Sequence, residues 1–278
     1  MKRVLLILAF LLMIISCNSP EKNPQFSESQ NITTKYTELK KIISIEVDDT
    51  FYVYIRVPKN YADKKDNYPV LYLLDGDIDF NMATSIVRYL QYGKEAPDLI
   101  IVGIGYGTMM DDSEQNFRKR DYTFTKIDKL EQSGGADKFL CFLSKELIPF
   151  IDKNYRTTEK RILNGYSLGG LFTIYASLKE NNLFDSYIIG SPYIKDNLDS
   201  LISLAENYSD FKSKIFITVG EKEDDENFHT PIKKMFNQFK NIAADKNNIK
   251  FTEFKNGSHF TCPSEALTYG LQSVLSEN

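Results

Sequence analysis

Short apolar segments separated by polar turns predict the strands of a buried sheet. Most are continuously apolar rather than alternating, which is typical of strands whose two faces are both covered. They lie at residues 70–74, 99–104, 162–163, 187–189, 215–219 and 249–254. Two earlier segments, 41–47 and 51–57, flank Asp48-Asp49 and predict an antiparallel hairpin.

Helical patterns lie between these strands. In residues 136–155 the side chains of Phe139, Leu143 and Leu147 fall on one apolar stripe. Strands that alternate with helices predict an α/β fold with a doubly wound, mostly parallel sheet. Residues 105–135 are charged and lack a clear period, so we expect a cap loop that passes over one sheet edge. The other helical segments are predicted at residues 168–178, 230–244 and 264–275.

The N-terminal residues have the pattern of an export signal. Lys2 and Arg3 precede unbroken apolar sequence from residue 4 to residue 15. This stretch is shorter than the roughly 18 residues that cross a bilayer, but it matches the apolar region of a signal peptide. It runs into Ser16-Cys17, and the tetrapeptide Ile-Ile-Ser-Cys resembles the lipobox of bacterial lipoproteins. An ordinary secretory signal that contains a cysteine is the alternative.

The chain is therefore expected to have three parts. We predict a lipoprotein signal peptide at residues 1–16, a flexible tether at residues 17–35 and a folded domain at residues 36–278. The tether is polar and has no apolar periodicity. Cys17 is expected to carry lipid and to hold the protein to a membrane. The protein would then lie in the cell envelope as a membrane-anchored lipoprotein, either periplasmic or surface-facing.

Charge excludes one class of partner. The chain has 34 Lys and Arg against 38 Asp and Glu, a formal net charge of -4, and loss of the signal peptide would make it -6. This balance offers no basic surface for a polyanion, so we expect no nucleic-acid partner. With 17 Tyr, 19 Phe and no Trp, any ring that stacks on a ligand comes from Tyr or Phe.

The most informative motif is a G-x-S-x-G sequence, Gly165 to Gly169, between a predicted strand and a predicted helix. A serine at such a turn stands exposed, and the small flanking residues let the backbone close tightly. Amides at the start of the helix then face the oxyanion that develops during acyl transfer. We predict Ser167 as a nucleophile, with a glycine-rich turn and an idle serine as the alternative.

A serine nucleophile needs a base, and the chain contains two histidines. His259 follows the last predicted strand, which is the position of the base when the residues occur in the order Ser, Asp or Glu, His. His229 follows the strand at residues 215–219, after which the acid is also expected, so base and acid would then have to come from the same segment. We therefore predict His259 as the general base.

The acid is expected just after the strand at residues 215–219. Positions 221–226 there hold five carboxylates, and most of them are expected to form a solvated turn. One should turn inward to orient the histidine and to stabilise its charged form. Glu223 is the first candidate, followed by Asp224 and Glu221.

Residues 75–79 are predicted to form a loop after the strand at residues 70–74. In this segment Asp75, Asp77 and Asp79 have the alternate spacing of a calcium-binding loop. An EF-hand loop also needs glycine at its sixth position and glutamate at its twelfth, where this chain has Phe80 and Ile86. Neither is there a histidine pair with the spacing of zinc ligands. We expect no metal and no cofactor.

Four motifs together resemble the esterase D-like branch of the α/β-hydrolases, nearest its siderophore esterase group. The branch also includes feruloyl and acetylxylan esterases, S-formylglutathione hydrolases and mycolyltransferases. The resemblance implies an α/β-hydrolase fold and a serine carboxylic-ester hydrolase. The motifs lie at residues 69–76, 120–123, 165–170 and 257–259, within a resemblance that spans roughly residues 41–275.

The resemblance also implies roles for individual residues. Ser167 is implied as the nucleophile, His259 as the base and Glu223 as the acid, although siderophore esterases can work with a weak or absent acid. The backbone amides of Leu168 and Asp77 are implied as the oxyanion hole. The family more often has a neutral residue at the latter position, so we expect that carboxylate to point away from the oxyanion.

We expect a lipid-anchored serine esterase that hydrolyses a carboxylic ester through an acyl-enzyme. A siderophore-type ester is favoured, because Arg118 and Arg120 supply cations for an anionic ligand from the predicted cap loop. Side chains of a solvated loop are the plain alternative for these arginines. A carbohydrate esterase of the feruloyl or acetylxylan type is the alternative function. A binding lipoprotein that keeps this fold without catalysis is less favoured.

Overall fold

A computed structural model of the protein describes residues 34–107, 117–128, 132–180 and 182–276. The predictions for Cys17, for the signal peptide and for most of the tether concern residues outside these ranges. Residues from Thr34 onward form one compact unit. Within the described ranges, no helix combines the length and the apolar character needed to span a bilayer.

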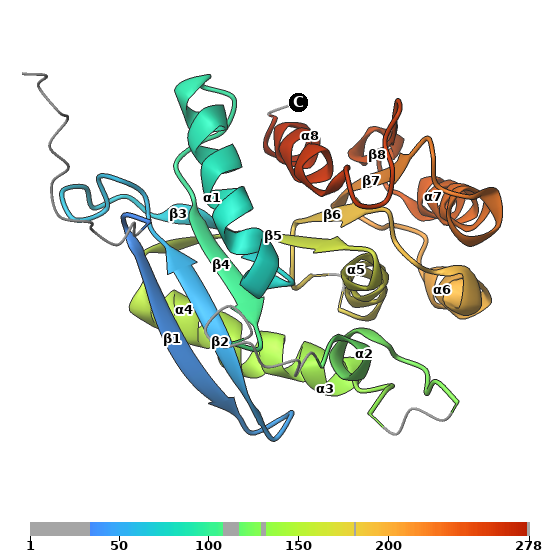
Figure 1. Ribbon diagram of the computed structural model, residues 1–278, viewed down its shortest axis with the longest axis horizontal. Coiled ribbons are helices and arrows are strands. Elements are labelled where there is room, and N and C mark those ends of the chain that lie inside the picture. Colours follow the sequence, from blue (N-terminus) through green and yellow to red (C-terminus); the bar gives the residue numbers. More distant parts are fainter. Residues whose placement is uncertain (1–33, 108–116, 129–131, 181, 277–278) are drawn as a thin grey trace, which may run out of the picture. The chain divides into compact units, whose positions relative to one another are not determined.

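The described strands form one eight-stranded sheet in the order β1-β2-β4-β3-β5-β6-β7-β8 (Figure 1). β1 and β2 form an antiparallel hairpin, β2 is antiparallel to β4, and all other neighbours are parallel. The predicted α/β fold, with its mostly parallel sheet and N-terminal hairpin, is therefore confirmed. The strands span Thr37–Ser44 (β1), Asp49–Arg56 (β2), Tyr68–Leu73 (β3), Ile100–Gly105 (β4), Thr157–Tyr166 (β5), Ser186–Gly190 (β6), Lys214–Gly220 (β7) and Ile249–Phe254 (β8).

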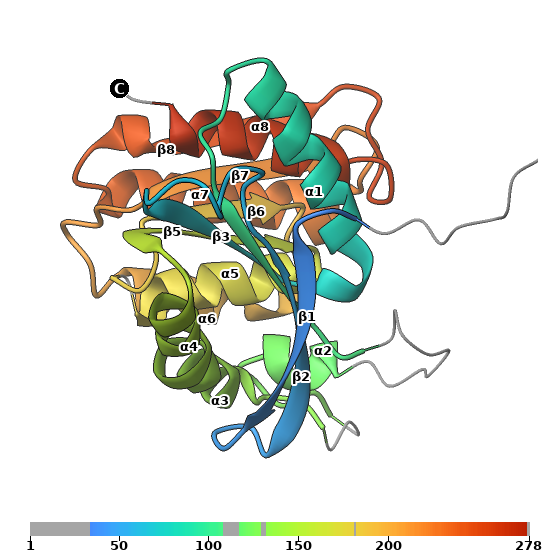
Figure 2. The same ribbon diagram turned by 90° about the vertical axis from the view of Figure 1, so that its left-hand side faces the viewer.

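Helices cover both faces of the sheet (Figures 1 and 2). On one face lie α1 (Gly76–Tyr92) and α8 (Pro263–Leu275), which contact each other. The other described helices belong to the opposite face, where a π-helical turn at Phe142–Leu147 joins α3 to α4. These helices are α2 (Arg118–Tyr122), α3 (Ala136–Cys141), α4 (Ile148–Asn154), α5 (Leu168–Lys179), α6 (Leu198–Ala205) and α7 (Thr230–Ile242).

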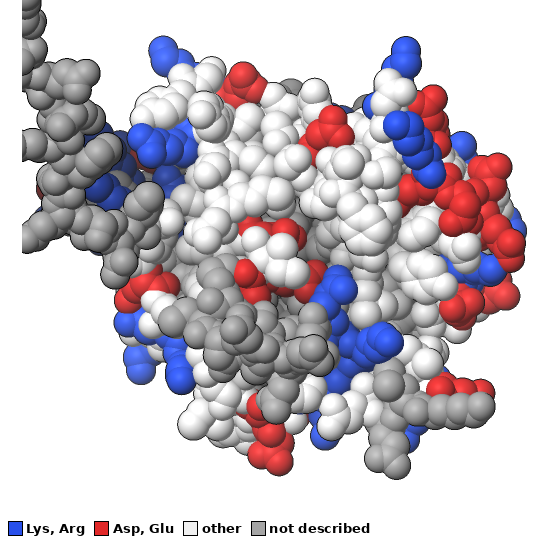
Figure 3. All heavy atoms as spheres, viewed as in Figure 1, with Lys and Arg blue, Asp and Glu red and all other residues white. Residues whose placement is uncertain are grey.

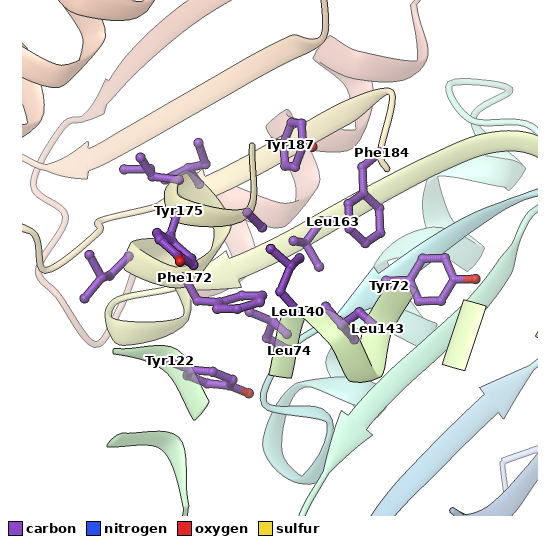
Figure 4. Packing of buried hydrophobic residues seen from close by; sticks show 14 of the residues in the cluster. Tyr72, Leu74, Tyr122, Leu140, Leu143, Leu163, Phe172, Tyr175, Phe184 and Tyr187 are labelled. Atoms are coloured by element: carbon purple, nitrogen blue, oxygen red, sulfur yellow. The ribbon is translucent and has the colours of Figure 1, made fainter. Parts of the chain in front are cut away.

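Alternate side chains of β3 pack into two separate hydrophobic cores, because successive side chains of a strand point to opposite faces of the sheet. Leu71 and Leu73 pack under α1 and α8, whereas Val70 and Tyr72 belong to the larger core on the other face. Figure 4 shows part of that larger core, with Tyr72 close to Phe184. Burial on both faces explains why this strand is continuously apolar in the sequence.

Three helices, α1, α2 and α6, were not expected from the sequence. The longest of them is α1. Residues 75–79, interpreted as a loop after β3, lie almost entirely within the first turns of α1, so that prediction is wrong. The acidic residues of the first turn led to the interpretation as a loop, although an apolar stripe at helical spacing follows them. This stripe is made of Phe80, Ala83, Val87 and Leu90. The helix begins at Gly76, where a Cβ would lie 2.7 Å from the backbone of β4.

Candidate active site

Ser167 stands on a sharp turn between β5 and α5. Its φ of 57° and ψ of -115° lie in a region that side chains other than glycine rarely adopt. The turn is held by two backbone hydrogen bonds, from the Ser167 amide to the Gly190 carbonyl at 2.9 Å and from the Tyr193 amide to the Ser167 carbonyl at 3.1 Å. Gly165 is required here, because a Cβ would lie 2.3 Å from the Gly169 carbonyl oxygen.

His259 and Glu223 reach this turn from loops that follow β8 and β7. His259 Nε2 lies 2.9 Å from Ser167 Oγ, and His259 Nδ1 contacts Glu223 Oε1. An ionised carboxylate only accepts hydrogen bonds, so Nδ1 carries the proton and Nε2 is left to accept one from the serine. The structure thus brings together the three residues predicted as nucleophile, base and acid.

The surroundings of Glu223 keep its carboxylate ionised. Its second oxygen accepts hydrogen bonds from Ser191 Oγ at 2.8 Å and from the Gly220 amide at 2.7 Å. Burial raises the pKa of Glu223, but the bonds from His259, Gly220 and Ser191 outweigh it and hold the pKa below its ordinary value. The carboxylate is therefore negative at neutral pH and can balance a positive charge on His259.

The competing candidates have other partners. Glu221 accepts a hydrogen bond from the Asn256 amide at 2.5 Å, and Asp224 accepts one from the Asn227 amide at 2.7 Å. The ring of His229 faces Glu253, with Nδ1 and Oε2 3.6 Å apart. None of these contacts involves Ser167, so the structure separates Glu223 and His259 from the alternatives that the sequence left open.

The two expected oxyanion donors lie at helix N-termini. Leu168 is the first residue of α5 and Asp77 the second residue of α1, and amides in a first helical turn have no partner within the helix. The side chain of Asp77 is held elsewhere. It accepts hydrogen bonds from Tyr54 Oη at 2.7 Å and from the Tyr106 and Gly107 amides at 2.5 and 3.1 Å. The amide is thus available while the carboxylate is turned to other donors.

Arg118 and Arg120 are ion-paired within the chain. Arg118 forms a bidentate ion pair with the Asp75 carboxylate, with hydrogen bonds of 2.6 and 3.1 Å. Its guanidinium also lies 3.5 Å from the Tyr166 carbonyl oxygen. Arg120 contacts Asp121 at 2.8 and 2.9 Å and Asp49 at 2.5 Å. Figure 3 shows the acidic and basic side chains of one face in scattered groups, some of them side by side, with broad white surface between them. The structure thus shows these arginines tying segments of the chain together, and their role in substrate binding stays a prediction.

Two residues that the sequence did not single out hold this site in place. Ser191, fully buried and with a φ of 34°, is the hydroxyl donor to Glu223. Tyr166 donates a hydrogen bond from its hydroxyl to the His259 carbonyl at 2.8 Å, and burial raises the pKa of this tyrosine so that it stays a donor. The G-x-S-x-G motif includes Tyr166, but Ser191 lies in a Gly-Ser-Pro turn with no chemical signature.

Removal of the Ser191 hydroxyl should weaken the orientation of Glu223. We expect Ser191→Ala to lower kcat about 10- to 100-fold with little change in KM, because a hydrogen bond to a charged group contributes about 1.5–3 kcal/mol. Steady-state kinetics on a model ester measure this. Ser177→Ala is the matched control, since among the described residues this buried hydroxyl has the Ile174 carbonyl within α5 as its partner, at 2.8 Å. Equal losses in both variants would contradict the role of Ser191.

The model of the Esterase family, described as "Putative esterase", matches residues 44–260. The ferri-bacillibactin esterase BesA of Bacillus subtilis is 28% identical over 269 residues, covering 89% of this chain and 92% of BesA. The crystal structure of the BES protein from Bacillus cereus superimposes with a TM-score of 0.80 at 28% identity, covering 91% of this chain and 100% of that one. An IroE-like serine hydrolase from Shewanella oneidensis gives 0.73 at 25% identity, covering 86% and 80%.

These matches agree with the geometry. The family model spans β2, the serine turn and the histidine loop, and the two structural neighbours cover 91% and 86% of this chain. The predicted resemblance to esterases near the siderophore group is confirmed. The chain belongs to the Esterase family and is an ester-hydrolysing enzyme with the α/β-hydrolase fold.

Proposed function

We propose that this enzyme is a serine esterase that works through an acyl-enzyme. The observation that carries the proposal is the chain of contacts from Ser167 Oγ to His259 Nε2, at 2.9 Å, and from His259 Nδ1 to a buried Glu223. This arrangement is the one that activates a serine hydroxyl for acyl transfer.

In the first half of the reaction, Ser167 Oγ attacks the ester carbonyl carbon while His259 Nε2 takes the hydroxyl proton. The carbonyl oxygen becomes an oxyanion, which the amides of Leu168 and Asp77 stabilise. The bond to the alcohol oxygen then breaks as His259 returns the proton to it. The alcohol leaves, and the acyl group stays on Ser167.

In the second half, water attacks the acyl-enzyme and His259 takes its proton. The bond between the acyl carbon and Ser167 Oγ breaks, the serine regains its proton, and the carboxylic acid leaves. Glu223 keeps its negative charge throughout and stabilises the imidazolium in both halves. No metal or other cofactor is required by this scheme.

We propose a siderophore-type ester as the substrate. Support comes from the ferri-bacillibactin esterase BesA, which is similar over nearly the whole length of both chains. The test compares kcat/KM of the full-length protein on a catecholate trilactone, on methyl ferulate and on acetylated xylan. Preference for the trilactone supports the proposal. Preference for either of the other two would leave an esterase of the carbohydrate type instead.

We also propose that Cys17 carries lipid and holds the enzyme in the cell envelope. The support is the apolar stretch that ends in Ile-Ile-Ser-Cys at residues 14–17. A single acyl chain binds membranes only marginally, so stable retention needs the several chains of a lipoprotein. In detergent phase partitioning, the wild-type protein should enter the detergent phase and Cys17→Ser the aqueous phase. Equal partitioning of the two would contradict the anchor.

A further inference from the structure

Large apolar side chains stand exposed on the residues next to the catalytic ones. Phe260, directly after His259, is 90% exposed, and Ile78, directly after Asp77, is 74% exposed. The Phe260 ring stands perpendicular to the imidazole, with centroids 5.3 Å apart. Exposure of this degree contributes little to folding, because neither side chain is removed from water. It leaves both side chains free to contact a substrate.

The topology of the sheet places these two side chains on different sides of Ser167. β3 and β5 are neighbours that end together, since the Leu74 amide donates to the Asn164 carbonyl at 3.0 Å. The first turn of α1, with Ile78, therefore lies at the same sheet edge as Ser167. The loop that carries His259 and Phe260 approaches the serine from the opposite direction, because β8 lies beyond β6 and β7 in the strand order.

Two further rings extend the surface around Phe260. The half-buried Phe228 packs on the His259 ring with centroids 4.9 Å apart, and Tyr193 meets Phe228 edge-on at 5.8 Å. Tyr193 is 37% exposed, and its amide is the donor to the Ser167 carbonyl. We name Tyr193, Phe228 and Phe260 the aromatic rim. The rim comes from the segments that follow β6, β7 and β8, with Phe228 in a π-helical turn, so it lines the histidine side of the serine.

The two arginines that the sequence offered for an anionic substrate are already ion-paired within the chain. Arg118 is paired with Asp75, and Arg120 with Asp121 and Asp49. A ligand that paired with either guanidinium would compete with a carboxylate already in contact. By contrast, the rings of the aromatic rim and the side chain of Ile78 have apolar surface to offer. Flat aromatic groups suit such a surface, because ring pairs add attraction beyond the burial of area.

We propose that Phe260, with Ile78 opposite, selects esters that carry an aromatic ring close to the ester carbonyl. This proposal rests on the proposed esterase function and adds the residues that determine its specificity. The ring is held between Phe260 and Ile78 while the carbonyl carbon lies at Ser167 Oγ. Recognition is thus apolar, and the selectivity for aromatic over small acyl groups should depend little on salt.

The test uses two methyl esters that share one alcohol, methyl 3-phenylpropanoate and methyl acetate, with the full-length protein and titration of the acid released. The wild-type protein should prefer the phenyl ester in kcat/KM. In Phe260→Ala this preference should fall about tenfold, mainly through a higher KM for the phenyl ester, and Phe260→Tyr should keep it. Ile78→Ser should lower the preference several-fold. Ile43→Ser, a change at a 79% exposed position on β1, is the matched control and should behave as the wild-type protein does.

The outcomes separate this proposal from the proposed function. If the wild-type protein hydrolyses both esters with equal kcat/KM, or if Phe260→Ala lowers both to the same extent, the specificity role is overturned and the esterase assignment stands. An equal loss would mean that Phe260 merely supports His259. If the wild-type protein hydrolyses neither ester, the proposed function falls and this proposal falls with it.

Discussion

Ser167→Ala and His259→Ala should each lower kcat by about 10⁴- to 10⁶-fold, and the double variant should be scarcely slower than either one. The reason is that the two residues act as one unit, with His259 Nε2 2.9 Å from Ser167 Oγ. Without the serine there is no nucleophile, and without the histidine the hydroxyl proton has no acceptor. Steady-state kinetics on a model ester measure all three variants.

The same kinetics provide a control and a pH signature. His229→Ala should keep activity near the wild-type level, since that ring contacts Glu253 rather than the serine. The wild-type rate should rise from acid to neutral pH, because only a neutral imidazole accepts the serine proton. Losses that multiply in the double variant, or a rate that is constant from acid to neutral pH, would contradict the assignment.

Glu223→Gln should lower kcat on the order of 10⁴-fold while the fold is kept. The Gly220 amide can only donate, and it lies 2.7 Å from Glu223 Oε2, so the oxygen of the new amide should take that position. The NH₂ group then faces His259 Nδ1 and forces the proton onto Nε2. A protonated Nε2 cannot accept a proton from Ser167, so the wrong tautomer abolishes the base.

Asp224→Asn is the matched control for this variant, because Asp224 is exposed and Asn can also accept the hydrogen bond from the Asn227 amide. It should change kcat by less than about twofold. If Glu223→Gln kept activity within a few-fold of the wild-type protein, a Ser-His dyad would replace the proposed triad.

The pH dependence of the free energy of unfolding should report the ionised state of Glu223 independently of activity. The folded protein lowers the pKa of this group, so its ionised form stabilises the fold above the ordinary value of 4.5 and that contribution is lost as the pH falls further. The difference in unfolding free energy between the wild-type protein and Glu223→Gln should therefore shrink on acidification. Urea unfolding at neutral pH and below about pH 4 measures this difference.

The sequence by itself determined the class of the fold and singled out the serine that we propose as the nucleophile. Strands that are buried on both faces are continuously apolar, so β3 and β4 could be predicted as strands without any knowledge of their neighbours. The serine turn has a local signature, because its geometry requires glycine at position 165 whatever surrounds it. The histidine followed from chain order, since successive parallel strands bring their carboxyl ends to one edge.

The polar first turn of α1 and the choice among the acidic residues needed the tertiary structure. The first turn of α1 is polar because Asp77 is buried against Tyr54 and the amides after β4, which are far away in the sequence. Glu223 differs from Glu221 and Asp224 only in the partners that it meets, among them Ser191, which lies 32 residues earlier.

The role of the charges and of the apolar side chains was also decided in three dimensions. The sequence predicted Arg118 and Arg120 as cations that bind an anionic ligand. In the structure they form ion pairs with Asp75 and Asp49, which come from distant segments of the chain. Phe260 reads as one apolar residue among many, and only the fold leaves it exposed beside the imidazole. A pattern of residue types records what each side chain prefers, whereas its partners depend on contacts between segments that the sequence separates by tens of residues.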